Sequence, residues 1–88
     1  MTQTTLKLTN RLGLHARPAA QLVQTAAKFS SKVTLAGNNK TVDAKSILSV
    51  MTMGLVGGMD ITLTADGQDE TACIASLTAL IENQFGEE

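Results

Sequence analysis

The chain has 88 residues, of which 43% are hydrophobic, 17% are charged and only two are aromatic, and its formal net charge at pH 7 is −1. A chain of this length forms one domain with a modest core, so we expect a single domain over residues 1–88. The nearly balanced charge and the scarcity of stacking rings disfavour nucleic acid as a partner.

Membrane-spanning and metal-binding functions are also disfavoured. No apolar run approaches the ~20 residues that a membrane-spanning helix needs, and the stretch MTQTTLKLTN lacks the features of a secretory signal. The chain has one cysteine, Cys73, and one histidine, so it offers neither an internal disulfide nor a metal-ligand spacing. We expect a cytoplasmic protein with no metal, no cofactor and no membrane partner, and we expect Cys73 to be a buried helix residue.

Hydrophobic periodicity predicts the elements of the first half of the chain. Residues 4–9 alternate between polar and apolar side chains, which is typical of a half-buried strand. Residues 16–28 carry apolar side chains at intervals of three and four, which predicts an amphipathic helix. Two more alternating segments, 31–36 and 40–44, flank the turn-forming sequence GNN and predict a β-hairpin.

The second half contains a short helix, a strand and a long helix. Residues 46–53 predict the short helix, which ends near Gly54, and residues 60–65 alternate as a fourth strand. The sequence DGQD at 66–69 offers turn and N-cap residues before the final helix. The apolar side of that helix is expected to consist of Ile74, Leu77, Ile81 and Phe85.

The order of these elements, βαββαβα, predicts the fold class. Strands and helices do not alternate as they do in parallel α/β proteins. We therefore expect an α+β fold, in which a four-stranded antiparallel sheet is covered on one face by three helices.

The stretch LGLHARPAA, residues 12–20, places the only histidine at the predicted start of a helix. His15 falls at the N-cap, and Pro18 is tolerated in the first turn because amides there have no partner within the helix. The unpaired amides of Ala16 and Arg17 and the helix dipole attract anions. Arg17 adds a planar cation that can bind two phosphate oxygens, so this constellation is typical of a phosphate site.

The residue type at position 15 favours a covalent role. An imidazole is a nucleophile, and a phosphoryl group placed on it would lie against the helix end and Arg17. A plain anion site needs no histidine, and helix caps are more often Ser, Thr, Asp or Asn. The residues alone leave an alternative open, in which His15 only caps the helix of a noncatalytic ligand-binding or regulatory module.

Residues 47–56 are unusually apolar. Seven of these ten residues are hydrophobic, whereas a core-facing helix needs about three in seven. The surplus, which includes adaptable methionines, predicts a docking surface. The alternative is a helix buried on nearly all sides, and Ser46 in front of it is predicted to be an N-cap.

The segment GLHARPA resembles the active-site motif of the HPr family, and the likeness extends along nearly the whole chain. HPr proteins are the histidine-containing phosphocarriers of the bacterial phosphoenolpyruvate:sugar phosphotransferase system. The resemblance implies an open-faced β-sandwich and a carrier that acts only with partner enzymes. It implies that His15 accepts phosphate on Nδ1 from phosphorylated Enzyme I and donates it to enzyme IIA components, with Arg17 as phosphate clamp and Pro18 as helix-start residue. It also implies that partners contact Ile47, Leu48 and Met51.

The sequence KSI around Ser46 is similar to the regulatory site of HPr proteins that an ATP-dependent HPr kinase/phosphorylase modifies. A phosphate on Ser46 would repel an acidic partner and attract an arginine-bearing one, such as a transcription regulator. A third interpretation makes Ser46 the working site and His15 a relic.

Position 12 leaves the branch of the family open. Many sugar-branch members carry a small polar residue there, which can form a hydrogen bond near the imidazole, and Leu12 cannot do this. TNRLGLHARPA is instead similar to the nitrogen-regulatory paralogues of HPr.

Overall fold

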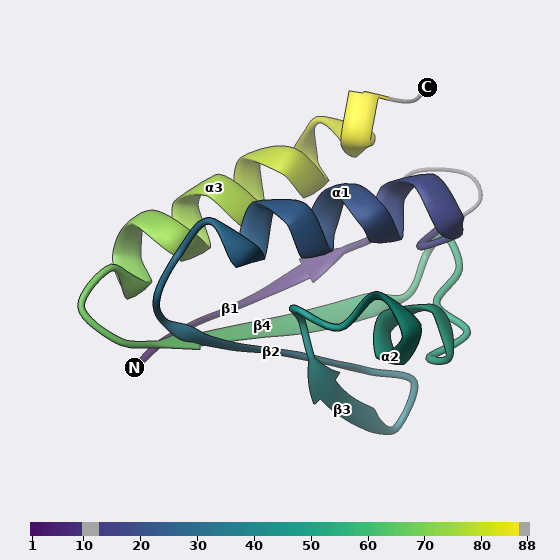
Figure 1. The fold of residues 1–88 in the computed structure, drawn as a ribbon. Helices are drawn as coiled ribbons and strands as arrows, with labels where there is room; N and C mark the ends of the chain where they lie inside the picture. The colour runs from purple at the N-terminus through teal and green to yellow at the C-terminus, as the bar shows by residue number, and fades with distance from the viewer. Residues whose placement is uncertain (10–12, 87–88) are drawn as a thin grey trace.

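The computed structural model describes residues 1–9 and 13–86, and it confirms the α+β fold. All the predicted strands and helices are present (Figure 1). In chain order they are β1 (Thr2–Lys7), α1 (Ala16–Ala27), β2 (Lys32–Gly37), β3 (Lys40–Asp43), α2 (Ile47–Met51), β4 (Asp60–Asp66), α3 (Glu70–Glu82) and a 3-10 turn, η1 (Gln84–Gly86).

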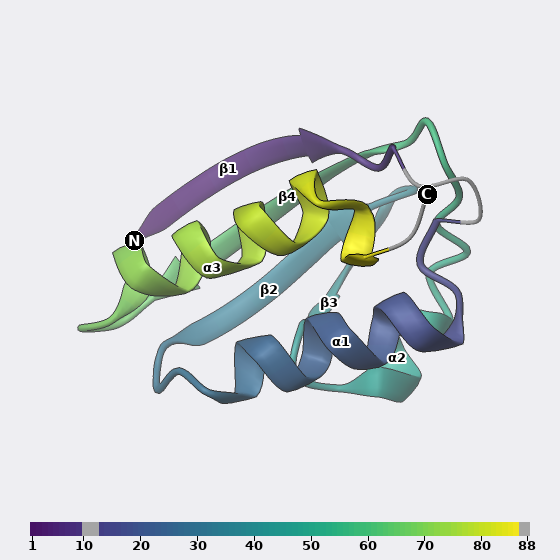
Figure 2. The ribbon, with the colours of Figure 1, turned by 90° about the horizontal axis from the view of Figure 1, so that it is seen from above.

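The four strands form one antiparallel sheet in the order β1-β4-β2-β3. Figures 1 and 2 show α1 and α3 side by side on the same face of this sheet. Helix α3 packs against β1 and β4, α1 contacts both other helices, and α2 contacts β3. Within the described part of the chain, none of the helices combines the length and the apolar character needed to span a bilayer.

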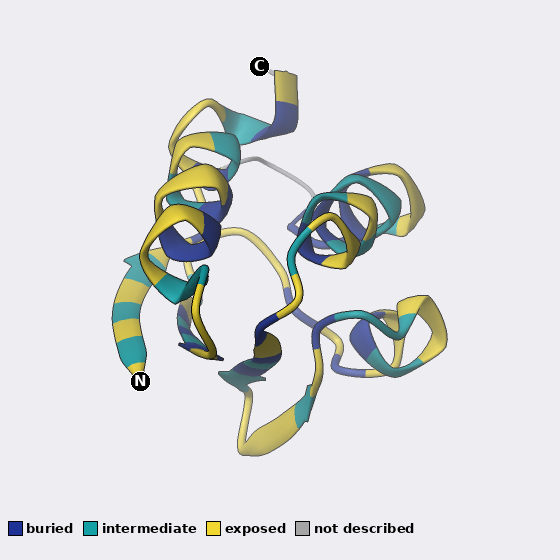
Figure 3. Cartoon of the chain, turned by 60° about the vertical axis from the view of Figure 1, so that its left-hand side comes forward, coloured by how far each residue is buried: buried dark blue, intermediate teal, exposed yellow. Residues whose placement is uncertain are grey.

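Alternation along the strands builds the core. In β4 the side chains of Ile61, Leu63 and Ala65 are buried under the helices, while those of Thr62 and Thr64 point to the other face. The buried residues of α1 recur at intervals of three and four, so they lie on one side of the helix, and this side faces the core (Figure 3). These buried helix residues are Pro18, Ala19, Leu22 and Ala26.

The face of the sheet that the helices leave uncovered carries polar side chains. The hydroxyls of Thr5 and Thr62 form a hydrogen bond of 3.0 Å, and the Gln3 amide donates to the Thr64 hydroxyl at 3.1 Å. Both pairs lie side by side across β1 and β4.

Two predicted helix ends differ from the structure. Helix α2 stops at Met51, and Met53 is buried beyond it. Helix α3 stops at Glu82, and Phe85 lies in η1 with a φ of 57°. The Phe85 ring nevertheless reaches the core and is only 2% exposed. Burial of an aromatic side chain outweighs the ~1 to 2 kcal/mol that a left-handed backbone costs.

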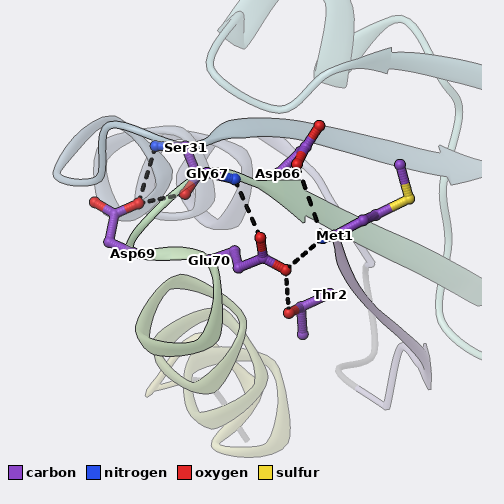
Figure 4. A network of polar contacts seen from close by, with 7 residues as sticks. All are labelled: Met1, Thr2, Ser31, Asp66, Gly67, Asp69 and Glu70. Atoms are coloured by element: carbon purple, nitrogen blue, oxygen red, sulfur yellow. Dashed lines mark hydrogen bonds and ion pairs between the residues drawn. The ribbon is translucent and has the colours of Figure 1, made fainter.

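The start of α3 is tied to two distant segments (Figure 4). Asp69 occupies the predicted N-cap, but its carboxylate does not cap α3. It instead accepts hydrogen bonds from the amides of Ser30 and Ser31, at 2.8 and 3.0 Å, and from both hydroxyls. The next residue, Glu70, accepts from the Thr2 hydroxyl at 2.5 Å and pairs with the Met1 amine at 2.8 Å.

These contacts make the stability of the fold depend on pH. Hydrogen bonds from the Ser31 hydroxyl and the Ser30 amide lower the pKa of Asp69 from 3.8 to about 2. Because the pKa is lower in the folded state, the carboxylate stabilises the fold above its unfolded pKa, and this contribution is lost as the pH falls from about 4 to about 2. We expect Asp69→Asn to unfold at a lower temperature than the wild type at pH 7 and to lose less stability between pH 5 and pH 2.

Thermal unfolding measured across this pH range tests the prediction. The control is Asp60→Asn, since Asp60 is exposed at the start of β4 and makes no side-chain hydrogen bond or ion pair with any residue that the structure describes. A wild-type and an Asp69→Asn curve that stay parallel down to pH 2 would contradict the role of this carboxylate.

Candidate functional site

His15 lies where the sequence predicts, at the N-cap of α1. Its backbone is extended, with φ −77° and ψ −173°, and its carbonyl accepts the hydrogen bond from the Ala19 amide at 2.9 Å. Its side chain is partly exposed and makes no capping hydrogen bond with the helix. The His15 side chain therefore does not act as the cap of α1.

The first turn of α1 provides the donors of an anion site. The amides of Ala16 and Arg17 precede the first intrahelical hydrogen bond, so they have no partner within the helix. Both residues are exposed, Pro18 is buried, and the turn contains no acidic residue. The Arg17 guanidinium makes no ion pair or hydrogen bond with residues 1–9 or 13–86. The positive charge of Arg17 and the amides of Ala16 and Arg17 thus lie at the same helix end as His15.

A close backbone contact fixes the chain just before His15. Gly13 has a φ of 66°, and a Cβ atom there would lie 2.4 Å from the Val56 Cα and 2.5 Å from the Leu55 carbonyl oxygen. The Leu14 amide donates to that same oxygen at 3.1 Å. The segment that follows α2 therefore lies directly against the segment that leads into α1.

This contact joins the histidine to an exposed apolar surface. We define the α2 surface as Ile47, Leu48, Met51 and Val56, whose exposed fractions are 41%, 73%, 47% and 50%. Val50, on the other side of the helix, is 1% exposed. The alternative of a helix buried on nearly all sides is wrong. Figures 1 and 2 show α2 and the start of α1 at the same end of the molecule.

Ser46 is confirmed as the N-cap of α2. Its hydroxyl oxygen accepts from the Ser49 amide at 3.4 Å and donates to the Ser49 hydroxyl at 3.0 Å. The side chain is partly exposed, next to Ile47 and Leu48 of the α2 surface. Leu12, on which the choice of branch depends, lies outside the described residues.

Two features of this site were missed from the sequence. The close approach of the Gly13 backbone to residues 55–56 was not foreseen. The contacts of the β2–β3 turn with the end of α2, at Asn38 and Lys40, were not foreseen. Among residues 1–9 and 13–86, no three of His, Cys, Asp and Glu come together as a metal site.

A family model described as "PTS HPr component phosphorylation site" matches residues 2–83 of this chain. The chain belongs to the HPr family. It is 42% identical to the phosphocarrier protein HPr of Treponema pallidum over 88 residues, which is 100% of both chains. It is 46% identical to the HPr of Cupriavidus necator over 87 residues, covering 99% of this chain and 98% of that one.

Solved HPr structures have the same fold. The crystal structure of HPr-C-His from Thermoanaerobacter tengcongensis aligns with a TM-score of 0.96 at 49% identity, over 100% of this chain and 99% of that one. The HPr crystal structure from Bacillus anthracis aligns with a TM-score of 0.86 at 35% identity, over 91% and 95% of the two chains. The open-faced β-sandwich expected from the resemblance is thereby confirmed.

The contact at Gly13 generates a stability prediction. Gly13→Ala introduces both a left-handed backbone for a residue with a side chain and a collision with the Val56 backbone. We expect the free energy of unfolding to fall by about 3 kcal/mol or more, of which the backbone alone accounts for about 1 to 2.

Chemical denaturation measures this loss. The matched control is Gly58→Ala, because Gly58 also has a positive φ, 93°, but a Cβ there would meet nothing within 4 Å. Equal losses for the two variants would show that the contact with residues 55–56 carries no energetic weight.

Proposed function

We propose that this protein carries a phosphoryl group on Nδ1 of His15, which it accepts from phosphorylated Enzyme I and passes to enzyme IIA components of the phosphotransferase system. The observation that carries the proposal is the placement of His15 at the start of α1, partly exposed and not used as a cap. If His15 served only as a helix cap, its side chain would accept a hydrogen bond from the first turn of α1, and it does not. Membership of a phosphocarrier family supports the same function.

The first turn of α1 supplies the electrostatics that phosphoryl transfer needs. When His15 is phosphorylated, the Nδ1 lone pair forms a bond to phosphorus while the bond from phosphorus to Enzyme I breaks, and Enzyme I keeps that electron pair. When the group passes to a IIA component, the acceptor forms the new bond to phosphorus and Nδ1 keeps the electron pair of the bond that breaks. Such reactions depend on alignment and on stabilisation of charge on the phosphoryl oxygens. The amides of Ala16 and Arg17 and the Arg17 guanidinium are the groups that we assign to these oxygens. Pro18 sets the backbone of the turn that presents them.

We propose the α2 surface as the place where Enzyme I and the IIA components dock. Exposed apolar side chains of this size cost free energy in water unless a partner covers them. Leu48 is 73% exposed, although Val50 on the same short helix is buried in the core. The contact of Gly13 with Val56 puts this surface beside the segment that carries His15.

Ser46 is proposed as a regulatory phosphorylation site, with an ATP-dependent HPr kinase/phosphorylase as the modifying enzyme. Its hydroxyl is partly exposed and caps α2. A phosphate at this position adds about −1.5 to −2 charge next to the proposed docking residues. That charge disfavours an acidic partner on the α2 surface and favours an arginine-bearing one, such as a transcription regulator.

The carrier function is tested by incubation with phosphoenolpyruvate and Enzyme I. We expect an acid-labile adduct on the wild type and none on His15→Ala. Arg17→Gln is expected to slow formation of the adduct about tenfold to a hundredfold, because it removes a charge-assisted hydrogen bond. Lys32→Gln is the control, since Lys32 is an exposed cation on β2, and its rate should not change. Absence of an adduct on the wild type would refute the carrier function.

Docking and its regulation are tested with three aspartate substitutions and the measured affinity for Enzyme I. Leu48→Asp is expected to weaken binding about tenfold or more, because it places a charge within an apolar contact. Ser46→Asp should also weaken binding while keeping a helix cap. Ser76→Asp, on the exposed side of α3, adds the same charge elsewhere and should leave the affinity unchanged. Unchanged affinity for Leu48→Asp in a folded protein would remove the α2 surface from the proposal.

A further inference from the structure

Helix α2 is too short to be stable without tertiary contacts. It contains five residues, and isolated helices of this length are not stable in water. The position of its exposed side chains therefore depends on what holds its two ends. Ser46 caps the first end, and the β2–β3 turn holds the second.

Two side chains, one from the β2–β3 turn and one from the first residue of β3, donate to the carbonyls that follow α2. The Asn38 amide nitrogen donates to the Met53 oxygen at 2.8 Å, and the Lys40 ammonium donates to the Thr52 oxygen at 3.1 Å. Both carbonyls lie just beyond Met51, the last helical residue, so these bonds tie the segment that follows α2 to another element. Figure 1 shows this turn close to α2.

The backbone conformation of the β2–β3 turn directs the Asn38 side chain toward the end of α2. Asn38 and Asn39 have φ values of 50° and 64°, which is the two-residue turn that suits a β-hairpin. Next to them, Gly37 lies against a residue that follows this end: a Cβ there would be 3.0 Å from the Leu55 Cδ2. The turn and residues 53–55 are thus in contact over several residues.

We propose that Asn38 and Lys40 are positioning residues for partner docking, because they hold the C-terminal end of α2 and so fix the arrangement of Leu48, Met51 and Val56 that a partner enzyme meets. This inference rests on the proposed function. Without these bonds α2 spends part of its time displaced, and the apparent affinity falls in proportion to the population that remains in place. The transfer step at His15 is unaffected, since the backbone bond from Leu14 to Leu55 remains.

The experiment compares Asn38→Gly with Asn39→Gly. Glycine adopts positive φ readily, so both variants keep the turn, but only the first removes a donor to α2. Asn39 makes no side-chain hydrogen bond within the described part of the chain. The readout is the rate of phosphorylation by Enzyme I as a function of carrier concentration. We expect Asn38→Gly to raise the KM about three- to tenfold with kcat unchanged, and Asn39→Gly to match the wild type.

Lys40 gives a second pair of variants for the same assay. Lys40→Met removes the donor and keeps the length of the side chain, and we expect it to raise the KM, while Lys40→Arg, which retains a donor, should restore it. Thermal unfolding is recorded for every variant. A role in stability alone predicts a lower Tm for Asn38→Gly with the KM unchanged at a temperature where the protein is folded.

The outcomes separate this inference from the proposed function. Equal KM values for Asn38→Gly and Asn39→Gly, with the wild type phosphorylated, would overturn the positioning role and leave the carrier function standing. A wild type that takes no phosphate would overturn the proposed function and, with it, the inference. A rise in KM confined to the variants that lose a donor would support both.

Discussion

The contact between Gly13 and the Leu55–Val56 backbone is the constraint on which this molecule depends. It brings together two segments that are more than forty residues apart in the chain, one leading into α1 and one leaving α2. No side chain fits between them, so glycine is required on steric grounds as well as for its positive φ. This contact, together with the packing of α1 against α2, brings the exposed start of α1 beside the α2 surface.

The proposed carrier needs a phosphate site of moderate strength. A helix end contributes about 0.3 to 1 kcal/mol to an anion at the surface, and a charge-assisted bond from Arg17 about 1.5 to 3. The site is open to water, which screens both contributions. Interactions of this size orient a phosphoryl group without trapping it.

Much of this fold and the central residue of the site follow from local pattern. Alternation predicted the four strands, the spacing of apolar residues predicted α1 and α3, and the HARP sequence placed His15 at a helix start. Contacts between segments that are distant in the chain could not be predicted from local sequence pattern. Asp69 has a residue type that is common at helix caps, yet its carboxylate accepts hydrogen bonds from two serines that are distant in the chain. Phe85 has the spacing of a residue on the apolar side of α3, yet the helix ends before it. In each case tertiary contacts override a local preference, and the periodicity of the sequence carries no information about such contacts.

The uncovered face of the sheet has a consequence for a protein that must leave every partner it meets. Its threonine and glutamine side chains bond to one another across β1 and β4, and among the large apolar side chains that the described residues expose, only Met1 lies beside this face, near Thr34 and Thr64. The other large exposed apolar side chains belong to the α2 surface, so a partner that recognises apolar side chains meets most of them at one end of the molecule.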